Sequence, residues 1–309
     1  MYRMSQKLLR ERSFSGRSCR TFYLGLIVCL LMVLGLGSTL HAGSWRLVAS
    51  IEKGKAGIFL HYPLGLNYDA ALGRLYVADA GNNRLISYTT DWKPLKIFDA
   101  AGQLRGPIGM VRERDGSLWV VERPINSLTF INLKLRKVER HHLTLKGRPV
   151  LVDKMTLWKD RLVILDRATG KILMLRKDLT VEREFAPGSR NFKGFFDLKS
   201  KGDILWGMET LSGRLFGFDA SGKVIDTFVP KKHLPQPVSF DRDAEGNVYI
   251  LDRYMKKLLI FNRDGSLRYE MLKKGFKPGQ LSYPWEVLMV GRSLLILDEG
   301  NGRIDVWNR

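Results

Sequence analysis

The stretch LYVADAGNNRL, residues 75–85, joins two apolar runs through a turn that carries an acid and a base. Residues 75–78 have the composition of a β-strand, and Asp79 closes this run. The residues Ala-Gly-Asn-Asn that follow are typical of a turn, and Arg84 opens the next apolar run. This stretch therefore predicts two strands joined by a tight turn, with a carboxylate at the end of the first strand.

The same pattern recurs along the chain at a nearly constant spacing. Acids close similar apolar runs at intervals of 43, 44, 43, 43 and 46 residues. These repeat acids are Asp79, Glu122, Asp166, Glu209, Asp252 and Asp298. A period of about 40 to 50 residues that contains only strands and turns is the signature of a β-propeller blade.

One repeat, residues 237–272, shows what each blade contains. Apolar runs at 237–241, 248–252, 257–261 and 266–272 are separated by turns rich in Gly, Asn and Asp. We name the four predicted antiparallel strands a, b, c and d. No segment after residue 44 shows the apolar stripe of a helix. The fold class predicted is therefore all-β.

The number of blades follows from the starts of strand a. We place these starts near Pro63, Pro107, Pro149, Gly194, Pro237 and Pro284. The last repeat ends with strand c at 303–309, whereas an unmatched strand stands at 45–51. Because an open ring would leave an unpaired strand edge, we predict that 45–51 supplies strand d of the last blade. Residues 43–309 then form one six-bladed propeller.

The repeat acids are interpreted as structural groups. A buried carboxylate needs hydrogen-bond donors, and we expect these to be backbone amides of the b–c turn or of the neighbouring blade. We also expect the base that stands five residues later in several repeats, such as Arg84, to pair with the acid. Six equivalent acids are too many for one active site.

Two stretches, YPLGLNYDAALGRLYVADAGNNRLISY (62–88) and GFKPGQLSYPWEV (275–287), resemble NHL repeats. The resemblance implies a six-bladed propeller over about 45–309. It is weaker in blades two, three and four, where Leu151 and Phe196 replace the expected Gly. NHL propellers include protein-binding modules, RNA-binding modules and a few metal-dependent enzymes, so the resemblance leaves the function open.

The first 42 residues differ from the rest of the chain. A basic segment precedes an apolar run at 22–37, and the small residue Ala42 follows. This order predicts a secretory signal peptide, with an uncleaved membrane anchor as the alternative. In both cases we expect the propeller in the periplasm or outside the cell, or held at the inner membrane by residues 22–37. Both cysteines, Cys19 and Cys29, lie in this leader, so we expect no disulfide in residues 43–309.

The chain is strongly basic, with a formal net charge of +20. The leader holds six bases and one acid, which leaves +15 on residues 43–309. This charge favours an acidic partner. For an exported protein we expect an acidic protein or an envelope polyanion rather than nucleic acid. We expect membrane contact only through an uncleaved leader, and a monomer.

Strand direction predicts where the bases gather. Because strands alternate, the d–a connections and the b–c turns share one face of the disc, and arginine with aromatic residues is typical of binding hot spots. The predicted binding face carries Arg105, Arg123, Arg148, Arg167, Arg190 and Arg253, with Tyr62, Tyr254 and Trp285. The function predicted is an exported binding or scaffold module that recognises its acidic partner through this face.

The alternative is a metal-dependent hydrolase or lyase that uses the central channel. Oxygen ligands for a divalent cation would come from Asp197 and Glu286, with Asp153 and Asp241 further along strand a. The sequence shows no Gly-rich phosphate loop, zinc-ligand spacing or nucleophile elbow. We therefore assign no catalytic residue and expect no cofactor beyond this possible cation.

Overall fold

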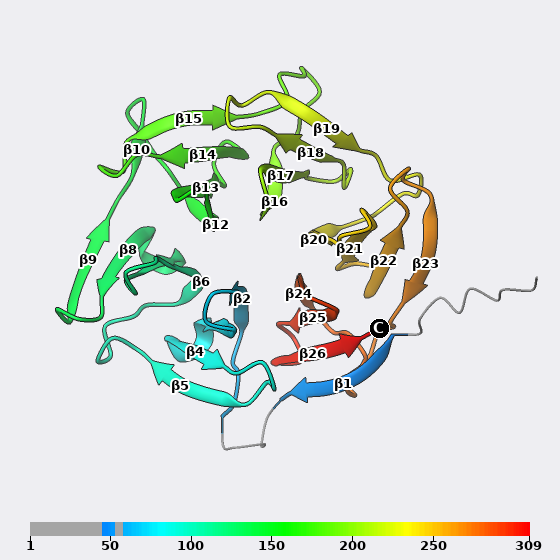
Figure 1. Ribbon diagram of the computed structural model, residues 1–309, viewed down its shortest axis with the longest axis horizontal. Coiled ribbons are helices and arrows are strands. Elements are labelled where there is room, and N and C mark those ends of the chain that lie inside the picture. Colours follow the sequence, from blue (N-terminus) through cyan, green and yellow to red (C-terminus); the bar gives the residue numbers. More distant parts are fainter. Residues whose placement is uncertain (1–44, 53–57) are drawn as a thin grey trace, which may run out of the picture. The chain divides into compact units, whose positions relative to one another are not determined.

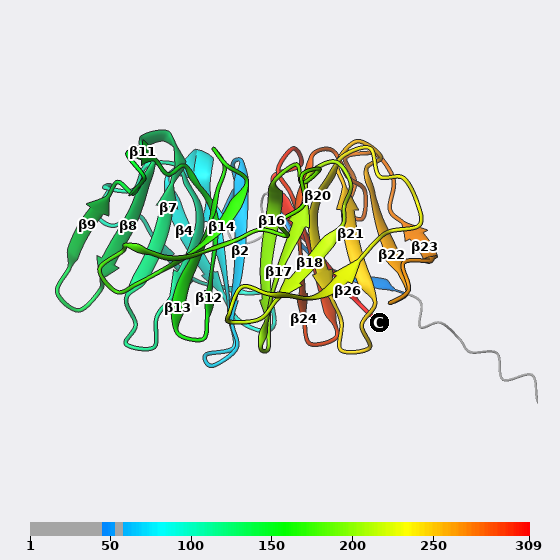
Figure 2. The same cartoon turned by 90° about the horizontal axis from the view of Figure 1, so that it is seen from above.

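The computed structural model describes residues 45–52 and 58–309. Six four-stranded antiparallel sheets surround a central axis, with strand a of each sheet innermost (Figure 1). Seen edge-on, the strands run between the two faces of the disc (Figure 2). The predicted signal peptide or anchor, residues 1–42, lies outside the described residues.

The four strands of each blade are named here in order from the axis outward. Blade 1 is β2 (Pro63–Asp69), β3 (Arg74–Asp79), β4 (Arg84–Tyr88) and β5 (Pro94–Phe98); blade 2 is β6 (Pro107–Arg112), β7 (Leu118–Glu122), β8 (Ser127–Asn132) and β9 (Lys137–His141). Blade 3 is β12 (Val152–Trp158), β13 (Arg161–Asp166), β14 (Lys171–Leu175) and β15 (Val181–Phe185); blade 4 is β16 (Phe195–Lys201), β17 (Ile204–Glu209), β18 (Leu215–Phe218) and β19 (Val224–Phe228). Blade 5 is β20 (Pro237–Arg242), β21 (Val248–Asp252), β22 (Lys257–Phe261) and β23 (Leu267–Met271); blade 6 is β24 (Pro284–Val290), β25 (Ser293–Asp298), β26 (Arg303–Asn308) and β1 (Arg46–Ile51).

Three short features complete the elements of the described residues. A two-stranded ribbon, β10 (Thr144–Leu145) with β11 (Arg148–Pro149), stands between blades 2 and 3. The 3-10 turns η1 (Ala80–Asn82) and η2 (Arg123–Ile125) form two of the b–c connections. The ribbon explains why strand a of blade 3 begins at Val152 and not near Pro149 as predicted. Within the part of the chain described, no helix has the length and apolarity to span a bilayer.

The N-terminal strand closes the ring as predicted. β1 pairs antiparallel with β26, and Ser50 lies opposite Asp305. The Ser50 hydroxyl donates a 2.6 Å hydrogen bond to the Asp305 carboxylate. Blade 6 is therefore built from both ends of the propeller, and β26 has no free edge.

Strands b and c are mostly apolar and largely buried, because adjacent blades cover both sides of each sheet. Every residue of β21 is buried, and the same holds for β7. The core consequently lies between blades. Between blades 3 and 4, for example, the ring of Phe218 packs edge-on against Phe185 at 5.6 Å and against Phe195 at 5.9 Å.

The six repeat acids are buried and bind the connection that enters their own blade. Each accepts a hydrogen bond from a backbone N–H that lies one or two residues before strand a, at 2.6 to 3.1 Å. The donors are His61, Arg105, Leu151, Lys193, Gln236 and Ser282. Some acids also accept from the b–c turn, as Asp252 does from the Met255 amide at 2.8 Å. The acids thus tie the d–a connection to the b–c turn, and the donors lie in the same blade, not in a neighbouring one.

The expected pairing with the base five residues later holds in two blades. Arg84 donates to Asp79 at 2.7 Å, and Arg214 donates to Glu209 at 2.8 Å. Lys171 and Lys257 instead form ion pairs with acids on strand d of their own blades. In blade 6, Arg303 instead donates to carbonyl oxygens of the d–a connection and pairs with Asp305 of its own strand.

A glycine at the axis sets how closely blades 1 and 2 approach. A Cβ atom on Gly65 would lie 2.4 Å from the Ile108 carbonyl oxygen and 3.0 Å from the Gly109 Cα. A Cβ at the equivalent Gly109 would meet no atom within 4 Å. We expect Gly65→Ala to lower the free energy of unfolding by about 1 to 3 kcal/mol, because backbone must move. Urea unfolding of both variants tests this, and equal effects of Gly65→Ala and Gly109→Ala would contradict it.

Candidate functional site

Trp285 lies at the centre of the predicted binding face, where it closes the mouth of the channel. Its side chain is buried, at 9% exposure, and its Nε1 donates a 2.8 Å hydrogen bond to the Leu64 carbonyl oxygen of blade 1. The ring also lies beside one residue from each remaining blade. These are Phe196 at 6.1 Å between ring centroids, and Arg123, Lys154 and Arg253, whose charged groups lie 5.7, 5.5 and 5.1 Å from the indole centroid.

Two of the predicted arginines stand beside Trp285 and already have acidic partners. Arg123 Nη2 lies 2.7 Å from Asp153 Oδ1, and Arg253 Nη2 lies 2.5 Å from Glu299 Oε2. Both guanidinium groups also lie over the Trp285 ring, and that of Arg253 lies 5.3 Å from the Tyr283 centroid as well. They are positioned by these contacts, so they shape the mouth and offer only part of their charge to a partner.

The other four arginines form the exposed perimeter of the face. Arg105, Arg148, Arg167 and Arg190 are all exposed. Among the described residues, none of these four side chains has a carboxylate within ion-pair distance. Arg148 and Arg167 belong to the same corner of blade 3, because the Arg167 amide donates to the Leu151 carbonyl at 2.8 Å. Their charge is therefore available to an acidic partner.

Exposed apolar side chains accompany this perimeter. Tyr62 and Tyr254 are 54% and 73% exposed, as the predicted face requires. The structure adds apolar residues that the sequence reasoning did not select, all from d–a connections or b–c turns. These are Phe59, Ile125, Leu211 and Phe276. Their position in those connections was the available signal, but only the structure shows that their side chains point outward.

Below Trp285 the channel holds a buried network of acids and lysines. Glu286 Oε1 accepts a 2.6 Å hydrogen bond from Lys199 Nζ, and its Oε2 accepts the Leu66 amide at 3.0 Å. Lys154 Nζ lies 3.5 Å from Glu286 Oε2 and 3.9 Å from Asp197 Oδ1, and it has no hydrogen-bond partner. Asp197 Oδ2 accepts from the Ser239 hydroxyl at 2.7 Å. Two carboxylates thus share two ammonium groups.

Burial and neighbouring charges move the pKa values of this network in different directions. Burial favours the neutral form of Glu286, but Lys154 and Lys199 outweigh it and lower the pKa of this carboxyl below 4.5. Burial dominates at Asp197 and raises its pKa above 3.8. Burial also opposes the charge of Lys199, yet Glu286, Asp197 and Asp241 together raise its pKa above 10.5.

Of the residues proposed as metal ligands, Asp197 and Glu286 lie in this network, and the oxygens of all four residues already have donors. Lysines occupy the positions beside Asp197 and Glu286, and Asp153 and Asp241 are paired with Arg123 and Lys201. The described part of the chain contains no group of three or more His, Cys, Asp or Glu side chains placed to hold a metal ion. This donor set does not fit a divalent cation, because ammonium groups occupy the positions that a cation would take. The sequence reasoning missed Lys154 and Lys199, although Lys199 lies two positions after Asp197 on the same strand.

Comparison with known proteins supports the fold alone. Solved structures with the same fold include a streptogramin B lyase, with a TM-score of 0.61 and 12% identity over 85% of this chain and 97% of that one. Virginiamycin B lyase from Staphylococcus aureus gives a TM-score of 0.56 and 13% identity over 86% of this chain and 100% of that one. A gluconolactonase from Xanthomonas campestris gives a TM-score of 0.60 and 13% identity over 81% of this chain and 87% of that one. No family model matches the chain, so the NHL resemblance stays a prediction. No curated protein matches it in sequence.

Proposed function

We propose that the protein is an exported binding module that docks an acidic partner on the face formed by its d–a connections and b–c turns. The observation that carries this proposal is the composition of that face. Exposed Arg148, Arg167 and Arg190 share this face with exposed aromatic residues such as Tyr62 and Tyr254. Arginine binds carboxylate, sulfate and phosphate groups with two parallel hydrogen bonds and also stacks on rings.

The shape of the mouth supports docking on the face over entry into the channel. Trp285 donates a hydrogen bond to Leu64 of blade 1 and lies beside residues of the other four blades, so it covers the axis at this face. A partner would therefore meet an aromatic floor with a cationic rim. The rival function, a metal-dependent hydrolase or lyase, rests on the likeness of fold to known enzymes, and fold does not imply function.

A charge-reversal experiment tests the location of the binding site. The variant Arg148→Glu/Arg167→Glu/Arg190→Glu should bind poly-L-glutamate about tenfold or more weakly than the unchanged protein, because it replaces attraction with repulsion. Fluorescence anisotropy of the labelled polymer measures this, and affinity should fall as salt rises. Arg123 and Arg253 are left unchanged, because each neutralises a neighbouring acid.

The control has the same change in net charge on the opposite face. Lys223, Arg263 and Arg292 are exposed residues of c–d and a–b turns, and all three are replaced by Glu. This variant should keep affinity within about threefold. If the control weakens binding as much as the first variant, net charge alone explains the effect. The proposal also predicts that the first variant, and not the control, loses partners captured from envelope extracts.

A further inference from the structure

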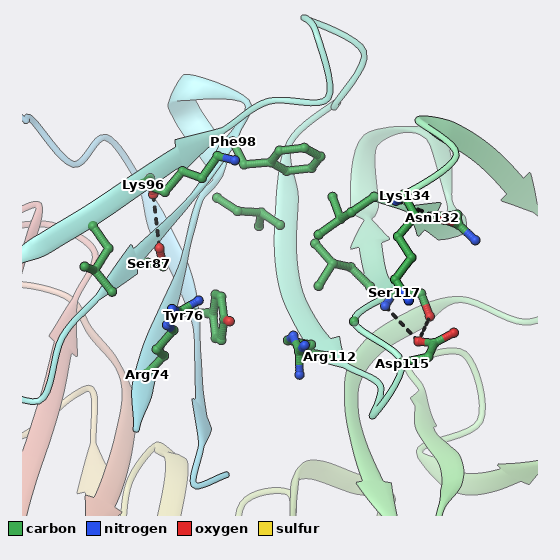
Figure 3. A pocket seen from close by; sticks show the side chains of 15 residues that line it. Arg74, Tyr76, Ser87, Lys96, Phe98, Arg112, Asp115, Ser117, Asn132 and Lys134 are labelled. Atoms are coloured by element: carbon green, nitrogen blue, oxygen red, sulfur yellow. Dashed lines mark hydrogen bonds between the residues drawn. The ribbon is translucent and has the colours of Figure 1, made fainter. Parts of the chain in front are cut away.

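A pocket opens between blades 1 and 2 toward the opposite face of the disc, away from the binding face described above. Its volume is about 580 Å³, which lies within the range of small-molecule sites. Figure 3 shows Arg74 and Tyr76 of blade 1 facing Arg112 of blade 2, with Phe98 and Lys134 further along. The pocket is thus lined by the side of the blade 1 sheet and by two turns of blade 2.

One repeat position that lines the pocket carries a small residue in blade 1. Ser87 lies between Tyr76 and Lys96 in the sheet, and its hydroxyl donates to the Lys96 carbonyl at 3.4 Å. The position eight residues after the repeat acid holds Phe130, Met174, Gly217, Ile260 and Val306 in the other blades. At Gly217 the neighbouring Ile204 and Trp206 fill the space. Replacing Ser87 by Phe, the residue that blade 2 has at this position, should therefore add a bulky ring to the lining of the pocket.

The pocket combines a basic rim with an apolar floor. Arg74, Lys96, Arg112 and Lys134 line it, against the single acid Asp115, which is held by Ser117 at 2.8 Å. Arg112 has a partial partner in Asp69 at 3.4 Å, whereas no carboxylate of the described residues lies within ion-pair distance of Arg74, Lys96 or Lys134. The floor is formed by buried Leu85 and Leu118, and Leu95 and Leu133 are about half exposed at its edge.

Two equivalent clefts lack this charge balance and serve as internal comparisons. The cleft between blades 2 and 3 has four acids among its lining residues, and the cleft between blades 4 and 5 has three. Of these three clefts, the one between blades 1 and 2 has the excess of unpaired cations. An anionic group placed there would gain charge-assisted hydrogen bonds that the chain itself does not supply.

We propose that this pocket binds a single-chain anionic amphiphile, with a carboxylate or phosphate head group at Arg74 and Arg112 and an aliphatic chain over Leu85 and Leu118. β3 and β4 are each paired on both sides, so only the outermost strand, β5, has a free edge to which an extended peptide could pair. The side chains that line the pocket present cations and hydrocarbon, and this combination favours an anionic amphiphile. The proposal is independent of the acidic partner on the other face.

Isothermal titration of the purified full-length protein with dodecanoate, below its critical micelle concentration, tests the proposal. Dodecyl phosphate should bind similarly, and neutral dodecyl maltoside about tenfold or more weakly. Ser87→Phe, which places a bulky ring beside the proposed aliphatic chain, and Arg74→Glu, which reverses one head-group charge, should each weaken dodecanoate binding about tenfold or more. Lys177→Glu makes the same charge change in the cleft between blades 2 and 3 and should keep affinity within about threefold.

Three results would overturn the proposal. The first is absence of dodecanoate binding to the unchanged protein. The second is dodecanoate binding that neither Ser87→Phe nor Arg74→Glu weakens in variants whose thermal unfolding matches the unchanged protein. The third is binding to phosphatidylglycerol vesicles without binding of monomeric dodecanoate or dodecyl phosphate, which would make this face a membrane-docking surface and not a ligand pocket.

Discussion

Replacing Glu286 by Gln is expected to destabilise the propeller by about 3 to 5 kcal/mol at neutral pH. The substitution keeps the size of the side chain but removes the charge that Lys199 contacts at 2.6 Å and Lys154 at 3.5 Å. Lys154 would then have only Asp197 within ion-pair distance, at 3.9 Å, and Lys199 would lose the carboxylate to which it is hydrogen-bonded. Urea unfolding followed by tryptophan fluorescence measures the loss.

A surface ion pair provides the comparison for this substitution. Arg114 and Asp160 lie 3.0 Å apart, but their side chains are 88% and 69% exposed. Asp160→Asn should change the free energy of unfolding by at most about 1 kcal/mol, since water screens the pair. Equal losses in Glu286→Gln and Asp160→Asn would show that the channel network contributes no more than a surface pair. A double-mutant cycle with Lys199→Met then isolates the coupling between Glu286 and Lys199.

The contribution of Glu286 should also depend on pH with a definite sign. Its pKa is lowered below 4.5 in the folded state, because Lys154 and Lys199 outweigh the effect of burial. Its stabilising contribution is therefore complete above pH 4.5 and is lost as pH falls through the lowered value. Asp197, with a raised pKa, has the opposite sign, because ionising it above its ordinary pKa of 3.8 costs stability. The stability difference between the unchanged protein and Glu286→Gln should thus be constant near neutrality and should shrink below pH 4.5. A difference that grows in acid would contradict this assignment.

Deleting residues 45–51 is expected to cost about 4 to 6 kcal/mol and to promote self-association. The deletion uncovers the backbone edge of β26 and exposes Ile304 and Val306, which are fully buried in the closed ring. It also removes Trp45, whose Nε1 donates a 2.5 Å hydrogen bond to the Tyr269 hydroxyl of blade 5. Denaturant unfolding measures the first effect and analytical ultracentrifugation measures the second.

A substitution within the same strand separates closure from general disturbance of β1. Val48 lies at the bulge of the pairing with β26 and is 51% exposed, so Val48→Ala should have a small effect. Ile51 lies opposite Ile304 and packs on the apolar cluster between blades 6 and 1, so Ile51→Ala should cost more. A deleted chain that remains monomeric and unfolds at the same urea concentration as the full one would rule out closure by this strand.

The sequence by itself determined the period, the strands of each blade and the closure of the ring. These features depend on local chemistry: an apolar run ended by an acid, a Gly- or Asn-containing turn, and an unmatched strand at each end. The strands predicted at 248–252 and 257–261 coincide with β21 and β22 for this reason. The repeat acids were also assigned a structural role from the sequence, although the amides they bind belong to their own blade.

Only the tertiary structure decided what the candidate sites contain, because their side chains come from different blades. Trp285 and Leu64, which are joined by a hydrogen bond at the channel mouth, are 221 residues apart in the chain. The lysines that engage Asp197 and Glu286 come from blades 3 and 4, so the sequence suggested metal ligands where the structure has ion pairs. The same holds for the exposure of Arg148 and Arg167 and for the pocket beside Ser87. A repeat fixes the position of each residue within its blade, whereas side chains meeting across blades fix its charge partner and its access to solvent.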